Sequence, residues 1–232
     1  MNSLVSILGG NKQAAPLNPY SGAFAAVIAA YPPWARYYGS ATDTTGNGRN
    51  GTVTGTVTSG SGIGNGATAS IPYITGTITD SVTFPSGSIP TNFTICAITR
   101  YTGSYNQRIL TNTSTGNYIF GHHTSGMQAY FNGTWATDAN TFASLGISST
   151  DWLVFCGKNG GTVPNNVLFN NIAKGTASGG TGSGILSING FSTGELSDWG
   201  FSHLIIWDKV LSDTDMATVS NALKSYLTTG EF

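Results

Sequence analysis

Short runs of β-branched and aromatic residues, separated by glycine-containing turns, decide the fold class of this chain more than any other feature. From residue 39 onward the turns fall at Gly46-Asn47-Gly48, Ser59-Gly60-Ser61-Gly62, Asn132-Gly133, Gly160-Gly161 and Gly179-Gly180. The runs between them cover residues 93–101, 117–120, 127–131, 152–156, 167–169, 185–188 and 201–207. Such spacing, with no helix pattern between the runs, is typical of antiparallel sandwiches and jelly rolls. The sequence therefore predicts an all-β, antiparallel β-sandwich.

One helix is expected after the last predicted strand. Ser212 and Asp215 have the spacing of a capping box, in which side chains satisfy the free N–H groups of the first helical turn. An apolar stripe follows, and Gly230 is a plausible C-terminal stop. The stripe repeats at helical spacing through Met216, Val219, Leu223, Tyr226 and Leu227. The sequence therefore predicts a single short C-terminal helix that packs on the sandwich or on a neighbour.

The composition excludes several classes of function. Only 8% of the 232 residues are charged, against about 25% in ordinary soluble proteins, and the formal net charge is −1. The nine basic residues are scattered, so neither a nucleic-acid interface nor a polybasic membrane patch is expected. The 11% aromatic content indicates a folded chain rather than a disordered one. A surface with so little charge is either hydrated by Thr, Ser and Asn or covered by other subunits.

The N-terminal segment, residues 1–38, differs from the rest of the chain. Its apolar run, residues 23–31, has no polar alternation and is far shorter than the roughly 20 residues of a membrane helix. The start lacks a basic region, so neither a signal peptide nor a membrane span is expected. The segment is either a first strand or short helix of the domain, or an arm that docks into a neighbouring subunit. The assembly contacts expected of an arm are Phe24, Val27, Ile28, Tyr31 and Trp34.

Cys96 and Cys156 both lie in strand-like apolar runs. Two cysteines do not make the framework of a disulfide-rich secreted domain, so two buried thiols are the first expectation and a disulfide is the alternative.

The titratable residues do not form a recognisable catalytic pattern. Glu195 and Asp198 flank a short turn, and no strand carries carboxylates at alternate positions, which would place a glycosidase pair on one face. His122 and His123 are adjacent, so on a strand they point to opposite faces and cannot share a metal. His203 lies among core residues. We therefore expect a protein that is not an enzyme.

Two binding sites remain as candidates. Asp43 and Asn47, in a glycine-rich loop, could offer oxygens to calcium, the only cofactor considered. The loop has only one acidic residue, which favours the alternative, an Asx turn in which Asp43 bonds the N–H groups of its own loop. Aromatic rings and amides that cluster near hairpin turns could hold sugar rings without charge; the alternative is that they are core or inter-subunit contacts. The glycan-binding candidates are Tyr101, Tyr105, Gln128, Tyr130, Asn132 and Trp135.

Three segments resemble a concanavalin A-like lectin/glucanase module of the laminin-G type. They are the loop that starts at Asp43, the run Phe93-Thr-Ile-Cys-Ala-Ile, and Ile205-Ile-Trp-Asp-Lys-Val-Leu-Ser-Asp-Thr-Asp-Met. The resemblance covers residues 37–229 and implies a jelly roll over residues 39–232. The Glu-x-Asp-x-x-Glu pattern of the glucanase branch is absent, so hydrolase activity does not transfer. Of the laminin-G calcium site, only Asp43 and its loop have a counterpart.

More narrowly, parts of the chain resemble modules encoded by large DNA viruses of algae. These parts are Phe84-Pro-Ser-Gly-Ser-Ile-Pro, Ile98-Thr-Arg-Tyr-Thr-Gly and Ser197-Asp-Trp-Gly-Phe-Ser. The first hypothesis is a non-enzymatic structural or recognition module of a virion, such as a capsid-associated, spike or fibre protein. Its partners would be other capsid or fibre subunits, including copies of itself, and cell-surface glycans. The second hypothesis is a soluble carbohydrate-binding lectin, and the third is a glycoside hydrolase.

Overall fold

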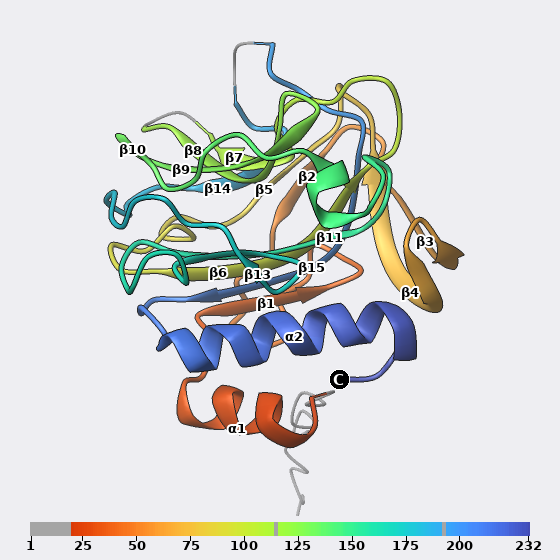
Figure 1. The fold of residues 1–232 in the computed structure, drawn as a ribbon. Coiled ribbons are helices and arrows are strands. Elements are labelled where there is room, and N and C mark those ends of the chain that lie inside the picture. Colours follow the sequence, from red (N-terminus) through yellow and green to blue (C-terminus); the bar gives the residue numbers. More distant parts are fainter. Residues whose placement is uncertain (1–19, 114–115, 192–193) are drawn as a thin grey trace, which may run out of the picture.

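The computed structural model describes residues 20–113, 116–191 and 194–232. Two layers of antiparallel strands pack face to face, and two helices lie beneath the lower layer (Figure 1). This arrangement confirms the predicted all-β antiparallel sandwich with a C-terminal helix. Residues 1–19 of the predicted N-terminal segment lie outside the described residues.

The lower layer is one eight-stranded sheet in the order β13-β12-β11-β6-β15-β4-β3, with β1 also paired to β15. Its strands are β1 (Ala35–Tyr38), β3 (Thr58–Gly64), β4 (Ala67–Gly76), β6 (Thr94–Tyr101), β11 (Leu153–Lys158), β12 (Val167–Phe169), β13 (Ile172–Ala173) and β15 (Trp199–Trp207). Because β15 pairs with β6 along one edge and with both β1 and β4 along the other, it is the centre of this sheet.

The upper layer combines a three-stranded sheet, β10-β9-β8, with a four-stranded sheet, β2-β5-β14-β7 (Figure 1). Its strands are β2 (Thr52–Thr54), β5 (Ser81–Thr83), β7 (Leu110–Asn112), β8 (Tyr118–His123), β9 (Gly126–Phe131), β10 (Thr134–Trp135) and β14 (Leu186–Ile188). A short 3₁₀ helix, η1 (Phe142–Leu145), follows β10 in the chain.

Two hydrophobic clusters hold the layers together, and β6 contributes to both. Ile95 and Ala97 face the upper layer, whereas Cys96 and Ile98 face the helices. Alternate residues of a strand point to opposite faces, so a strand covered on both sides is apolar throughout. Both faces of β6 are therefore buried.

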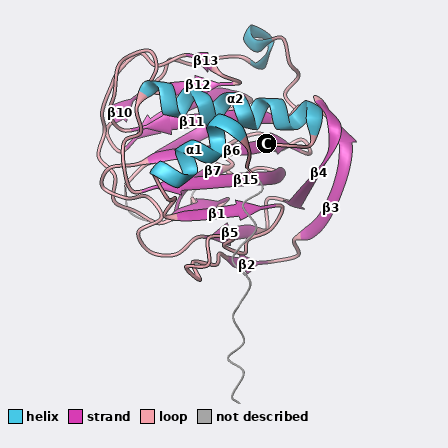
Figure 2. Cartoon of the chain, turned by 90° about the horizontal axis from the view of Figure 1, so that it is seen from below, coloured by secondary structure: helices cyan, strands magenta, loops and turns pink. Residues whose placement is uncertain are grey.

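The C-terminal helix, α2 (Asp213–Thr229), forms where the sequence predicts it. The Ser212 hydroxyl accepts the Asp215 backbone N–H at 3.0 Å, and Gly230 ends the helix in the left-handed conformation with a φ of 74°. All five residues of the predicted stripe are buried against the lower sheet. The helix lies across the outer face of that sheet (Figures 1 and 2).

The described part of the N-terminal segment belongs to the domain itself, as a short helix followed by a first strand. Residues 22–30 form a helix, α1 (Gly22–Ala30), which packs on α2 of the same chain, and Phe24 and Val27 are buried there. The strand β1 then pairs with His203–Ile206 of β15, so the sandwich begins at Ala35 rather than after residue 38. Among the described residues, no helix has the length and apolarity needed to cross a membrane.

The expectation of two free thiols is wrong. Cys96 on β6 and Cys156 on β11 are directly opposite in the antiparallel register, and a disulfide joins them. Both side chains are fully buried between the lower sheet and the helices. Strand register brings the two together, and the sequence alone does not show that register.

Candidate functional site

The outer face of β9 carries polar and aromatic side chains at alternate positions. Met127, Ala129 and Phe131 are buried toward the core, while Gln128 and Tyr130 are only partly buried on the opposite face. Trp135 on β10 is paired with Tyr130 in the antiparallel register and therefore lies on that same outer face. Apolar and polar residues alternate along β9, and this alternation places Gln128 and Tyr130 together on the outer face.

These side chains touch one another, and His123 of β8 joins them. The Tyr130 and Trp135 rings meet edge to face, with centroids 4.8 Å apart, and 47% of Trp135 is exposed. The His123 ring lies 6.2 Å from that of Trp135, and its Nδ1 is hydrogen-bonded to Oε1 of Gln128. We call these four residues the aromatic patch. It offers an exposed indole face beside a phenol, an amide and an imidazole, with no carboxylate or Lys/Arg cation among them.

The other glycan-binding candidates lie elsewhere. Tyr101 is fully buried in the core, and its hydroxyl donates to the Gln107 carbonyl at 2.6 Å; burial raises the pKa of this phenol. Tyr105 is 56% exposed in the loop after β6. Asn132 occupies the β9–β10 turn with a φ of 39°, and its amide donates to Thr181 Oγ1 at 3.2 Å. The structure thus brings together Gln128, Tyr130 and Trp135 of the six.

His123 is missing from the glycan-binding candidates that the sequence offers, although it belongs to the aromatic patch. The signal was available, because adjacent strand residues face opposite ways. His122 points into the core, where its Nδ1 lies 3.1 Å from Thr99 Oγ1 and burial lowers its pKa to about 3. Its neighbour His123 therefore points outward, on the face of Gln128.

In the loop that contains Asp43, the carboxylate is held by the loop's own donors. Asp43 accepts backbone N–H groups of Thr45 at 3.0 Å, Arg49 at 3.1 Å and Arg36 at 3.2 Å. Burial raises the pKa of this carboxyl, but the N–H donors outweigh burial and leave it below its ordinary value. The amide of Asn47 donates instead to the Trp34 carbonyl at 3.4 Å. Calcium binding at Asp43 and Asn47 stays a prediction.

The carboxylates tested for catalysis also have structural partners. Glu195 pairs with the buried guanidinium of Arg108, and Asp198 accepts the backbone N–H of Tyr105 at 3.2 Å. Within the described ranges, no three residues among His, Cys, Asp and Glu lie close enough together to hold a metal ion.

No protein-family model matches this sequence, and no curated protein matches it. Solved structures do share its fold. Domain 4 of an extracellular GH43 arabinanase from Geobacillus stearothermophilus, solved with arabinotriose, is similar over 82% of this chain and 98% of that domain. The TM-score of this comparison is 0.52 and the sequence identity is 12%.

Two larger proteins contain a similar part. A mutant of Trypanosoma rangeli sialidase that displays trans-sialidase activity matches 84% of this chain, with a TM-score of 0.53 and 10% identity. The receptor binding domain of a botulinum neurotoxin C/D mosaic serotype matches 81% of this chain, with a TM-score of 0.51 and 12% identity. This chain covers only 33% of the sialidase and 50% of the neurotoxin domain. At such low identity these likenesses establish the fold alone, an antiparallel β-sandwich.

Proposed function

We propose that this protein is a non-enzymatic recognition module that binds glycans through the aromatic patch. The observation that carries the proposal is the half-exposed Trp135 ring, held edge to face by Tyr130 beside the Gln128 amide. Exposed rings bordered by a few oriented polar groups are common in binding sites for uncharged small molecules. The arabinanase domain solved with arabinotriose supports a sugar as the ligand.

Each side chain of the patch has a role in this proposal. The indole face of Trp135 supports the apolar face of a sugar ring, while the Tyr130 hydroxyl can donate and accept. An amide oxygen only accepts, so His123 donates from Nδ1 to Gln128 Oε1 in this arrangement. The amide Nε2 of Gln128 has no acceptor among the described residues and can donate to a sugar hydroxyl. The hydrogen bond to His123 fixes that orientation.

We propose further that the protein does not hydrolyse the glycans that it binds. Glu195 and Asp198 are the two carboxylates considered above as a possible glycosidase pair. Glu195 forms an ion pair with Arg108, and Asp198 accepts the backbone N–H of Tyr105. A glycoside hydrolase needs one carboxyl free to donate a proton and a second free to attack or to activate water. A reducing-sugar assay with glycans bound by the protein should therefore give no product.

A glycan array tests the binding proposal. The wild-type protein should bind a defined set of neutral glycans, and Trp135→Ala should lose that binding. Ile172→Ala is the matched control, because Ile172 is 44% exposed but lies on β13, in the other layer. Binding should survive in the control. An array with no bound glycan, or binding unchanged by Trp135→Ala, would refute the proposal.

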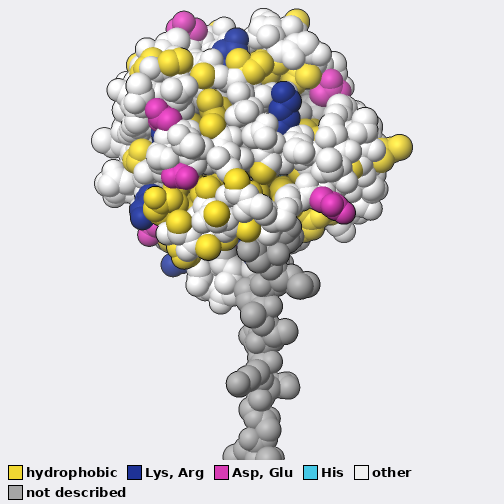
Figure 3. All heavy atoms as spheres, turned by 60° about the horizontal axis from the view of Figure 1, so that its bottom comes forward, with side chains coloured by type: hydrophobic (Ala, Val, Ile, Leu, Met, Phe, Trp, Pro, Cys, Tyr) yellow, Lys and Arg dark blue, Asp and Glu magenta, His cyan; other side chains and the backbone are white. Residues whose placement is uncertain are grey.

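We also propose that the protein assembles with copies of itself in a virus particle, as a capsid-associated, spike or fibre component. The observation that favours assembly is α1, whose nine residues are all apolar or glycine. Phe24 and Val27 cover α2, whereas Ala23, Ala26 and Ala29 remain exposed on the other side. Hydrophobic side chains gather over the helices in Figure 3, where charged side chains occur singly. A helix that is apolar all round is usually buried.

Of the remaining assembly candidates, Ile28 and Tyr31 pack with the helices, whereas Trp34 packs against the core between the two layers. Ile28, Tyr31 and Trp34 are each partly buried, so each has an exposed portion that a second copy could cover. Ala26→Lys should convert an oligomer into a monomer in light scattering. The control is Asn221→Lys on exposed α2 surface. A monomeric wild-type protein, or failure to co-purify with virus particles, would count against this proposal.

A further inference from the structure

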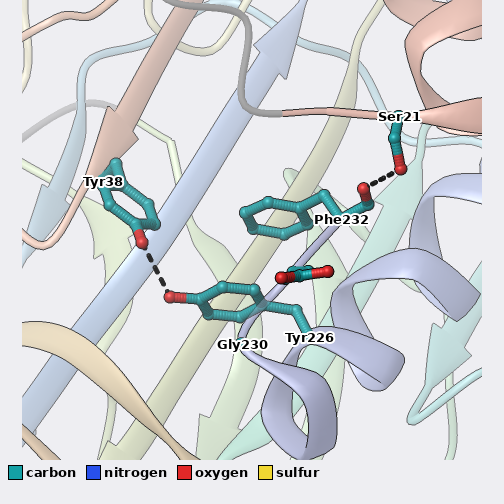
Figure 4. A pocket seen from close by; sticks show the side chains of 6 residues that line it. Ser21, Tyr38, Tyr226, Gly230 and Phe232 are labelled. Carbon is teal, nitrogen blue, oxygen red and sulfur yellow. Dashed lines mark hydrogen bonds between the residues drawn. The ribbon is translucent and has the colours of Figure 1, made fainter.

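A hollow opens at the C-terminal end of α2, where that helix, β1 and the residue before α1 come together (Figure 4). Its volume is about 300 Å³, at the lower end of the range for ligand pockets, so a ligand that fits here is small. The lining residues are Ser21, Tyr38, Tyr226, Gly230, Glu231 and Phe232. None of them belongs to the aromatic patch, so the hollow is a separate feature of the molecule.

Three aromatic rings line the hollow. Phe232 stacks on Tyr226, and the Tyr38 ring meets both of them at a steep angle. The Tyr38 centroid lies 6.2 Å from that of Tyr226 and 6.4 Å from that of Phe232, with 66° and 64° between the ring planes. Tyr226 is buried, whereas Tyr38 is 37% exposed and Phe232 is partly exposed, so these two supply open ring surface. Aromatic rings attract cations through the negative charge on their faces.

Contacts within the domain hold these rings in place. The hydroxyls of Tyr38 and Tyr226 are hydrogen-bonded, and the Ser21 hydroxyl donates to the carbonyl of Phe232 (Figure 4). The buried His203 ring lies within 5.1 Å of all three aromatic rings. Burial lowers the pKa of His203 to about 3, so this imidazole adds no positive charge at neutral pH. Walls that are fixed in advance reduce the entropy cost of binding.

The charge at the hollow is negative. Glu231 contributes an exposed carboxylate that takes part in neither of the two ion pairs found among the described residues. Gly230 ends α2, and the free carbonyls of a helix end have a partial negative charge. The last turn of α2 contains no basic residue that would offset this charge. Both features stabilise a cation at this position.

No lysine or arginine lines the hollow. Arg36 of β1 extends to the Tyr20 ring, with its guanidinium carbon 5.0 Å from the ring centroid. Lys224 lies two residues before Tyr226 on α2, and residues at that spacing do not share a helix face. The hollow therefore combines open aromatic surface with a carboxylate and has no cation of its own.

We propose that this hollow binds a small organic cation with a quaternary ammonium group. Tyr38 and Phe232 supply ring surface for the methyl groups of the cation, and the Glu231 carboxylate balances its charge. A quaternary nitrogen has no N–H, so it needs no hydrogen-bond acceptor at a fixed position, and aromatic surface is its usual partner in proteins. The inference does not depend on glycan binding by the aromatic patch.

Calorimetry with the full-length protein tests the site with two probes, choline and dimethylbutanol, its uncharged carbon analogue. The two probes have the same shape, but in the second a carbon atom replaces the charged nitrogen. Choline should bind, and the alcohol should bind about threefold to thirtyfold more weakly, because it has no charge for the rings and the carboxylate to attract.

Variants with matched controls assign the binding to this hollow. Tyr38→Leu removes an aromatic ring and should weaken choline binding by about threefold to thirtyfold, the range of one cation–π contact. Tyr38→Phe keeps the ring and should keep the affinity. Glu231→Gln should also weaken choline binding, whereas Asp208→Asn, at an exposed position before α2, should leave it unchanged.

Several outcomes would overturn the proposal: no choline binding, equal binding of the two probes, or unchanged binding in Tyr38→Leu or in Glu231→Gln. If Tyr38→Leu does not fold, the two probes and Glu231→Gln still decide the question. Trp135→Ala should keep choline binding. Loss in that variant would assign the ammonium group to the aromatic patch and overturn the proposal, whereas failure of the array experiment leaves this site untouched.

Sedimentation with phosphatidylcholine vesicles distinguishes two sources of the ammonium group. Vesicle binding that free choline displaces would support the proposal with a lipid headgroup as the ligand. Binding of choline without binding of vesicles would support it with a soluble ammonium compound.

Discussion

The hydroxyl groups of Tyr38 and Tyr226 lie 2.8 Å apart and form a hydrogen bond between β1 and the last turns of α2 (Figure 4). Phe232 stacks on the Tyr226 ring, with centroids 4.2 Å apart and 5° between the ring planes. With Ser21, these residues line a hollow of about 300 Å³ at the end of the helix. The contact fastens the C-terminal end of α2 to the edge of the sheet that β1 forms.

Tyr38→Phe and Tyr226→Phe should each lower the free energy of unfolding by about 1 kcal/mol, the usual net value of one hydrogen bond. Both changes remove the same bond, so the double variant should lose little more than either single one. Urea denaturation of the three variants measures this. Tyr105→Phe, at an exposed loop position, serves as the control and should have no effect. Fully additive losses would show that the two hydroxyls do not act on each other.

Two buried histidines should make the protein less stable in mild acid. Burial lowers the pKa of His122 and of His203 to about 3 each, from the ordinary 6.5. The unfolded chain therefore binds more protons than the folded one below pH 6.5, and stability falls as the pH decreases from there toward 3. The slope is about 1.4 kcal/mol per pH unit for each histidine at most.

Urea midpoints at pH 7 and pH 5 measure that slope, in a range above the titration of the carboxyls. His122→Gln and His203→Gln should each reduce the slope, because each removes one of the two buried imidazoles. Equal midpoints of the wild-type protein at the two pH values would contradict the prediction.

Oxidised protein should contain no free thiol. Cys96 and Cys156 should fail to react with a thiol reagent after unfolding without reductant, and both should react once a reductant is added. Replacing both with Ala should cost about 2–4 kcal/mol of stability, since the bond closes a long loop in the unfolded chain. Two reactive thiols in the unreduced protein would contradict the prediction.

Asp43→Asn should destabilise the protein by about 1–3 kcal/mol, because the N–H groups of Arg36, Thr45 and Arg49 would lose a charged acceptor. Thermal unfolding with calcium and with a chelator separates this role from metal binding. Equal melting temperatures in both solutions would mean that the carboxylate serves the loop alone. A rise with calcium in the wild type that is absent from Asp43→Asn would support the proposed calcium site.

Features encoded within a few residues could be predicted. The cap at Ser212 and the stripe from Met216 to Leu227 are local patterns, and both define α2 in the structure. The period of two along β9 likewise places Gln128 and Tyr130 on one face. In each case residues that are close in the sequence are also close in space, so the sequence pattern is enough to predict which side chains share a face.

Features that depend on contacts between distant segments could not be predicted from the sequence. The uniform apolar run of α1 has no period that separates a helix from a strand, and its conformation follows from packing on α2. Tyr101 and Tyr105 are four residues apart, yet the end of β6 divides a buried ring from an exposed one. Trp152 contacts both Arg100 and Tyr73, and these residues lie directly before β11, on β6 and on β4, so the contacts depend on how three distant segments pair.

The place of β15 has a consequence for how the polypeptide is made. The last strand in the chain order supplies the middle of the lower sheet, and β1, β4 and β6 all hydrogen-bond to it. During synthesis these three earlier strands leave the ribosome before their common partner exists. Folding of the lower sheet should therefore wait until translation has passed Trp207. Until then the nascent chain presents open strand edges, and a chaperone would have to shield them from aggregation.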